Sequence, residues 1–317
     1  MNKNLIAIAV AGVLSAPMAA QAADSMDAKV SGFVDTFLTF TNDNDGTNTG
    51  IGAGSMCDNG TTNACETQFD VAESEIDVEA MGVRIDVDHK SASGNSLEQA
   101  NFTVDMSGWA LTAGLFNSNL TVDGQDAPDM MFSTPSLVAL NYGMAGGIAG
   151  ADLTNVAGAQ ISGMAGPATL RLAVINDPTI NLATDDAANA FIVGASGSVM
   201  DGLDLAVNMT STDADDLTDV QVNYTLDALR INLDYMTSDY TDVYSVMAGY
   251  DLGNGMGVKV RIDNDDNGTE VTDTTTVHFD YAMTDNVALA LENYSVSSDA
   301  AGANDWSATT LEFIATF

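Results

Sequence analysis

Acidic side chains recur at every second position in short runs of this sequence. In "ESEIDVEA", Glu75, Asp77 and Glu79 alternate with Ile76 and Val78. Successive side chains of a β-strand point to opposite faces, so such a run has one charged and one apolar face. Fixed charges on a wetted surface attract or repel ions and orient dipolar solutes. The pattern therefore indicates a charged wall rather than a single reactive group.

We expect this wall to extend over several strands. Lys259 stands between Val258 and Val260, and Arg230 between Leu229 and Ile231, so the basic side chains also lie opposite apolar ones. The residues expected on the wall are Glu75, Asp77, Glu79, Arg84, Asp86, Arg171, Arg230, Lys259 and Arg261.

Catalytic chemistry is not expected. General acid–base or nucleophilic catalysis needs a base with an orienting partner. The chain has two histidines, and Asp280 follows His278 by two positions. Any two polar residues on one face of a strand have this spacing, so it does not indicate a catalytic pair. We therefore expect no enzyme and no cofactor.

One acidic segment partly matches a calcium loop. Asp263, Asp265 and Asn267 have suitable spacing and precede Gly268, but the twelfth position is Thr274 rather than glutamate. This makes the three residues a weak calcium candidate. Loose binding of Ca²⁺ or Mg²⁺ by acidic loops, bridging lipopolysaccharide phosphates, is the stronger expectation.

The start of the chain and its charge restrict the class of protein. Residues 1–22 combine one lysine, a short apolar stretch and a small-residue site ending at Ala22, the pattern of a cleaved signal peptide. The remainder, 23–317, is expected to form one domain. With 45 acidic and 8 basic residues and a net charge of −37, the chain offers no basic patch for nucleic acid.

Cys57 and Cys65 lie in a Gly/Asn/Thr-rich loop of this exported chain, which favours a disulfide.

The elements that carry the wall are alternating strands. Tight connections such as Asp201-Gly202 and Asn254-Gly255 alternate with longer acidic ones such as "STDADDLTD". Counting every run gives about 18 strands, and merging weak runs between Ile148 and Ala165 gives about 16. Short turns alternating with long loops predict an all-β, transmembrane, antiparallel up-and-down barrel. A soluble β-sandwich is the competing fold, but it would bury many unpaired acids at high cost.

The last strand, "TTLEFIATF", places Leu311, Phe313, Ala315 and Phe317 on one face, with Ile314 as an exception on the polar face. With the signal peptide and the loop order, this strand resembles the general porins of Gram-negative outer membranes. The resemblance implies a homotrimer, and it implies that Phe317 is the signal read by the barrel-assembly machinery.

The resemblance also implies a constriction. In that family the loop after the fifth strand folds into the barrel. The fifth strand expected here is "WALTAGLF", so the loop would be 117–135, with a further long loop at 42–66. "APDMMF" stands where the family carries Pro-Glu-Phe-Gly. The acids of this loop, which would face the basic residues of the wall, are Asp123, Asp126 and Asp129.

The expected function follows from these elements. A water-filled barrel in the outer membrane would pass small hydrophilic solutes and ions by diffusion, and the excess of acids would favour cations. The alternative is a structural or adhesive barrel with a closed lumen and divalent-cation-binding acidic loops.

Overall fold

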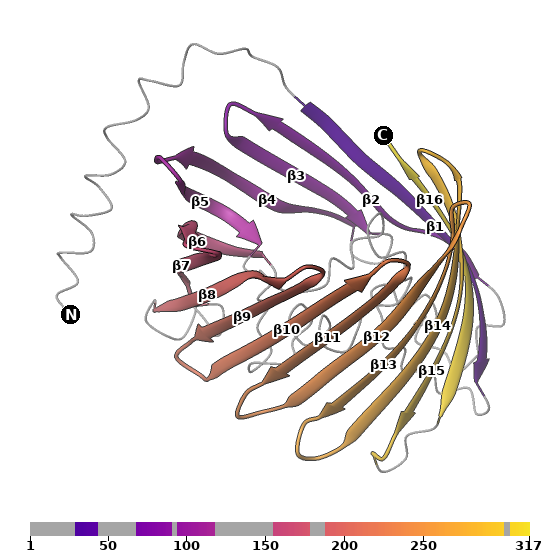
Figure 1. Cartoon of the computed structure of the whole chain (residues 1–317). Helices are drawn as coiled ribbons and strands as arrows, with labels where there is room; N and C mark the ends of the chain where they lie inside the picture. The colour runs from indigo at the N-terminus through magenta and orange to yellow at the C-terminus, as the bar shows by residue number, and fades with distance from the viewer. Residues whose placement is uncertain (1–28, 44–67, 91–93, 118–154, 178–187, 301–304) are drawn as a thin grey trace.

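The computed structural model describes residues 29–43, 68–90, 94–117, 155–177, 188–300 and 305–317. Sixteen strands in these residues form one closed antiparallel barrel, each pairing with its neighbours in sequence, and β1 pairs with β16 to close it (Figure 1). The strands are β1 (Lys29–Asp43), β2 (Gln68–Ala80), β3 (Val83–Lys90), β4 (Gly94–Asp105), β5 (Trp109–Asn117), β6 (Asn155–Ala165), β7 (Ala168–Asn176), β8 (Asn189–Met200), β9 (Leu203–Ser211), β10 (Asp216–Leu226), β11 (Leu229–Thr237), β12 (Asp242–Gly253), β13 (Met256–Asp266), β14 (Val271–Thr284), β15 (Val287–Ser298) and β16 (Trp306–Thr316). The predicted barrel is confirmed, with the lower of the two strand numbers.

The strands bury their polar face and expose their apolar face. On β11, Asn232 and Asp234 are almost fully buried, whereas Ile231 and Leu233 are 37% and 39% exposed. The same alternation runs along β7, where Arg171 is buried between exposed leucines. A water-soluble protein arranges these residue types the other way round. The outward surface is therefore suited to an apolar solvent.

One end of the barrel carries tight turns. Met81-Gly82 and Asn254-Gly255 have positive φ at both positions, the backbone of a two-residue hairpin turn. The carbonyl of Gly82 accepts a hydrogen bond from the backbone N–H of Thr103 at 2.6 Å, which ties this turn to the next hairpin. The expected tight turns are therefore confirmed.

Two connections at the opposite end of the barrel are shorter than the sequence indicated. The acidic segment 211–219, expected as a loop, contributes only 212–215 to the connection, because β10 already begins at Asp216. Likewise β13 continues to Asp266, so 267–270 alone joins it to β14. Polar residues at these strand ends keep the ladder hydrogen bonds of the sheet, which composition alone does not reveal.

The closing seam explains the irregular residue of the last strand. Ile314 points inward and is 3% exposed, and it packs against Phe33 of β1. Beyond β16, Phe317 exchanges two backbone hydrogen bonds with Gly32, at 3.0 and 3.2 Å. The apolar exception on the polar face is thus a contact between the first and last strands.

In the described part of the chain, no helix is long and apolar enough to span a bilayer. Four predicted features lie outside the described residues: the signal peptide 1–22, most of the loop 42–66, the cysteines Cys57 and Cys65, and the loop 117–135 apart from Asn117.

Candidate functional site

The inward face of the barrel is polar and predominantly acidic. Within the sixteen described strands, eight buried inward carboxyl side chains contrast with two buried inward guanidinium groups, Arg171 and Arg261. The acids, each at most 4% exposed, are Asp35, Asp86, Asp88, Asp219, Asp234, Asp263, Glu292 and Glu312. Buried charges need partners, so their contacts determine what the interior can do.

A first group of charges lies on β2 and β3. Arg84 places Nη2 at 2.8 Å from Oδ1 of Asp77 and at 3.5 Å from Oδ2 of Asp86. Carboxylate oxygens of Glu75, Asp77 and Asp86 lie within 4.8 Å of one another, the one such acidic group in the described strands and turns. Because the guanidinium of Arg84 already contacts two of the three carboxylates, we interpret the arrangement as an ion-pair cluster. The four side chains lie close together on β2 and β3.

A second group lies on β13 and β14. Arg261 and Asp263, two positions apart on β13, form a buried ion pair with Nε at 3.0 Å from Oδ2. The hydroxyl of Thr274 on β14 donates a hydrogen bond of 2.6 Å to the same Asp263 oxygen. A buried pair of this kind is costly to break, because the remaining charge has no water to solvate it.

A third group crosses β13, β14 and β15. Lys259 reaches Oδ1 of Asp280 at 3.0 Å. His278 is fully buried, with Nδ1 at 3.1 Å from Oε2 of Glu292 and Nε2 at 3.6 Å from Oδ1 of Asp280. Gly257 makes room here, since a Cβ at this position would lie 2.7 Å from Oδ2 of Asp280. Both ring nitrogens of His278 face carboxylates, so the imidazole is not presented to a nucleophile.

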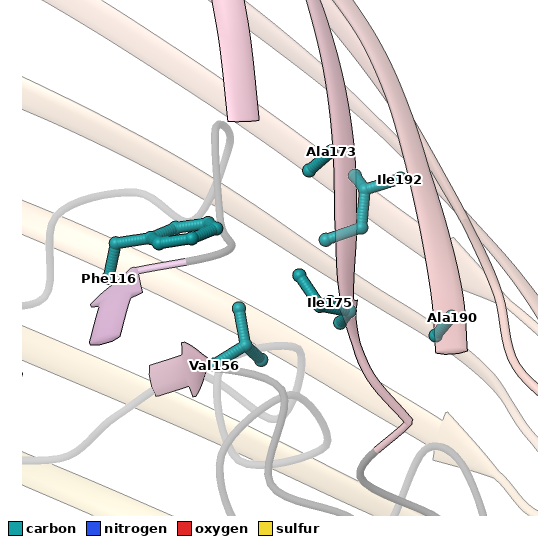
Figure 2. Close-up of a cluster of buried hydrophobic side chains, with 6 residues drawn as sticks. All are labelled: Phe116, Val156, Ala173, Ile175, Ala190 and Ile192. Carbon is teal, nitrogen blue, oxygen red and sulfur yellow. The ribbon is translucent and has the colours of Figure 1, made fainter. Parts of the chain in front are cut away.

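The inward face also carries an apolar cluster of six residues, which the sequence analysis missed. It occupies the ends of β5 to β8 that face the long connections, and its members are 0–4% exposed. Figure 2 shows them gathered into one group: Phe116, Val156, Ala173, Ile175, Ala190 and Ile192. A signal was available, because "LRLAVIN" alternates leucine and valine with alanine and isoleucine, so both faces of this strand end are apolar.

An interior cavity of about 550 Å³ lies along β2 to β6. Its lining is mainly polar and extends from the Met81-Gly82 turn to Phe116. Along this wall Arg84, Gln99 and Gln160 are only half-buried, in contrast to the buried charges of β13 to β16. These three side chains are therefore accessible from the cavity.

The remaining predicted residues are distributed as follows. Glu79 and Arg230 lie next to tight turns and are exposed, whereas Arg171 is 2% exposed inside. Arg84, Lys259 and Arg261 pair with carboxylates of the wall itself. The predicted loop acids Asp123, Asp126 and Asp129 lie outside the described residues.

The predicted calcium loop requires a correction. Asp263 and Asp265 belong to β13 rather than to a loop. Asp263 pairs with Arg261, and Asp265 accepts a hydrogen bond from the hydroxyl of Thr241. Asn267 lies in the connection and accepts hydrogen bonds from the N–H groups of Thr269 and Glu270. These side chains do not converge on one ion, because strand pairing continues through the acidic segment.

Comparison with known proteins gives similarity in structure only. No protein-family model and no curated protein sequence matches the chain. The outer-membrane channel DcaP of Acinetobacter baumannii is similar with a TM-score of 0.68 and 13% identity, over 92% of this chain and 98% of that one. An anion-selective porin from Comamonas acidovorans is similar with a TM-score of 0.64 and 12% identity, over 92% of this chain and 100% of that one. A variant of the Rhodopseudomonas blastica porin is similar with a TM-score of 0.60 and 16% identity, again over 92% of this chain and 100% of that one. The chain therefore shares the sixteen-strand porin fold.

Proposed function

We propose that this protein is an outer-membrane porin, a water-filled channel for the passive diffusion of small hydrophilic solutes and ions. The observation that carries the proposal is the inverted barrel, with an apolar outward face and a charged inward face. Only a closed barrel satisfies every strand hydrogen bond while facing hydrocarbon. No catalytic role is part of this proposal.

The outward face supports a location in lipid. On β12 the outward residues from Tyr244 to Leu252 are apolar or aromatic. They span about 27 Å along the strand, or about 21 Å of height at a tilt of about 40°. This is close to the apolar band of about 25 Å in outer-membrane barrels. The proposed route is export through the signal peptide 1–22 and assembly through Phe317, with lipopolysaccharide around the acidic outer loops.

We propose a preference for cations. The buried inward acids outnumber the buried inward guanidinium groups, and low-dielectric walls focus the resulting field. One of the structurally similar proteins is named as an anion-selective porin, so the fold does not set the sign of the ion preference. The charges on the wall must set it, and here they are mainly negative.

The constriction proposed from the sequence is the loop 117–135, with Asp123, Asp126 and Asp129 facing the passage. The apolar cluster of Figure 2 supports this, because Phe116 and Val156 adjoin the two ends of the segment 118–154. An inward apolar surface at both ends would hold apolar residues of that segment inside the barrel. The cavity beside β2 to β6 then marks the proposed path of solutes. A homotrimer and a Cys57–Cys65 disulfide complete the proposal.

Planar-bilayer recording tests the channel. We expect steady single-channel currents and, in a salt gradient, a reversal potential of the sign that indicates cation preference. Absence of any steady current would support a closed structural barrel instead. Anion preference with normal conductance would refute the selectivity alone.

The constriction has its own test. The triple variant D123N/D126N/D129N should lose part of the cation preference. The matched control D213N/D216N/D239N removes equal charge from exposed positions at the long-connection end and should keep the preference. Equal behaviour of the two variants would place the selectivity elsewhere on the wall.

A further inference from the structure

One side of the cavity beside β2 to β6 carries no charge. Residues 99–103 of β4 and the whole of β5 and β6 contain no acidic or basic residue, and we call this part of the wall the uncharged side. The cavity volume of about 550 Å³ lies within the range of about 300–1,000 Å³ that is usual for pockets holding small molecules. The chemistry of the uncharged side therefore determines which solutes it can bind.

Three polar side chains form a row across the uncharged side. In the strand registers Thr103 lies opposite Thr112, and Thr112 lies opposite Gln160. All three line the cavity. Two residues further along the same face, Gly114 of β5 lies opposite Gly158 of β6, so the wall has no side chain at either position. Glycine inside a strand often marks a place where a ligand approaches the backbone closely.

The amide groups beside the cavity retain donors and acceptors. Asn101 donates one hydrogen bond to the carbonyl oxygen of Leu115 at 3.1 Å. Gln99 donates one to Oδ2 of Asp86 at 3.3 Å. A primary amide has two N–H donors and one acceptor oxygen, so each of the two amides retains one donor and its oxygen. Oε1 of Gln160 receives no hydrogen bond from the described part of the chain, so this amide is free to turn toward a solute.

The two threonines add a further donor. Their hydroxyl oxygens, on Thr103 and Thr112, are 2.8 Å apart, and either can donate to the other. Whichever donates, the other hydroxyl keeps its proton. A carboxylate uses donors alone and an ammonium group uses acceptors alone, whereas a hydroxyl group both donates and accepts. The mixture on the uncharged side therefore fits a neutral solute with several hydroxyl groups.

The charged side of the same cavity does not favour an anionic solute. Lys29, Glu79 and Arg84 line it, and Glu79 lies opposite both basic residues in the strand registers. Arg84 also contacts Asp77 and Asp86. Acids outnumber basic residues at the positions of β2 and β3 that share this face, which are Asp70, Glu73, Glu75, Asp77, Glu79, Asp86 and Asp88 against Arg84 and Lys90. An anion would be repelled along this side.

We propose that the uncharged side of this cavity binds neutral polyhydroxylated solutes, of the size of a small saccharide, as they cross the channel. Hydroxyl groups of the solute hydrogen-bond to Gln160, Asn101 and the threonine pair, and the two glycines let the solute approach the wall. This inference rests on the proposed channel function and names a class of solute for it. Binding is weak and reversible, because a transported solute must leave as well as enter.

Single-channel recording of the full protein in potassium chloride tests the proposal. Maltose should reduce the current with a saturable dependence on its concentration. Polyethylene glycol of similar mass is neutral but has few hydroxyl groups, and it should reduce the current without saturation. Gln160→Leu should weaken the maltose block by about fivefold to tenfold, because the hydrogen bonds of one amide are lost. The control Asn293→Leu, which removes an exposed amide on β15, should keep the wild-type block.

The outcomes separate this inference from the channel itself. A steady current that responds alike to maltose and to polyethylene glycol overturns the inference and leaves the channel in place. Saturable block by glycylglycine without block by maltose also overturns it, because the solutes would then be zwitterions. Equal maltose block in the wild type and Gln160→Leu refutes the assignment to this cavity. No steady current in potassium chloride alone refutes the proposed channel. If Gln160→Leu does not assemble, Thr112→Val, which removes one hydroxyl at nearly constant volume, takes its place.

Discussion

Replacement of Leu233 by arginine tests the orientation of the barrel wall. Leu233 is the central residue of β11, points outward and is 39% exposed. Its partners on the two neighbouring strands are Val222 and Val246, which share the outward face. An arginine here would enter hydrocarbon if lipid surrounds the barrel and would enter water if the protein were soluble.

The expected magnitude follows from the position along the strand. β11 runs from Leu229 to Thr237, about 27 Å at 3.4 Å per residue, with Leu233 about 14 Å from each end. At a tilt of about 40° this places Leu233 close to the bilayer midplane. Arginine on the lipid face at that depth costs about 2–4 kcal/mol, or roughly a hundredfold in the unfolding equilibrium.

The assay is reversible urea unfolding of the barrel in lipid vesicles, followed by the fluorescence of the two tryptophans, Trp109 and Trp306. The matched control is Thr237→Arg, on the same strand and face at the end near the long connections. Near the interface the cost should fall to about 0–1 kcal/mol. The difference between the two variants is therefore the measured quantity.

One result would refute the reasoning. On a soluble protein, arginine at a 39% exposed position would change the free energy of unfolding by only about 0.5 kcal/mol. If Leu233→Arg and Thr237→Arg both cost so little, water rather than lipid contacts the outward face. The membrane location would then fall together with the channel.

Three further predictions concern the interior and the turns. Gln160→Trp, which fills the cavity beside β2 to β6, should lower single-channel conductance. The control Ile161→Trp, on the outward face of the same strand, should not. Equal conductance of the two variants would place the path of solutes elsewhere in the barrel. Gly202→Ala should destabilise more than Gly166→Ala in urea unfolding. Both have positive φ, which costs about 1–3 kcal/mol, but only at Gly202 would a Cβ meet a backbone oxygen, at 2.1 Å. Arg261→Met should cost about 3–5 kcal/mol by leaving a buried carboxylate unpaired, and a cost below about 1 kcal/mol would mean that water reaches it.

The strands and their faces could be predicted because alternation is local. Glu75, Asp77 and Arg84 lie on the polar face as expected, since period two follows from the geometry of any strand. The ends of strands were less predictable. Asp263 and Asp265 look like loop residues by composition, yet pairing with β12 and β14 keeps them in β13.

The partners of the charges could not be predicted in the same way. Lys259 and His278 were visible as polar residues on two strands, but their contacts with Asp280 and Glu292 depend on the register between β13, β14 and β15. The inward apolar cluster also needed the structure, because its members come from four strands. The sequence does not contain the register explicitly, since turns and long-range pairing set it together.

The sequence by itself determined that each strand has one polar and one apolar face. Polar and apolar residues alternate along it, and neighbouring side chains of a strand must point to opposite faces. Tertiary structure alone decided that Asp35 meets Glu312 and that Ile314 meets Phe33. Those contacts exist only because the barrel closes, which places the first and last strands side by side at a fixed register (Figure 1).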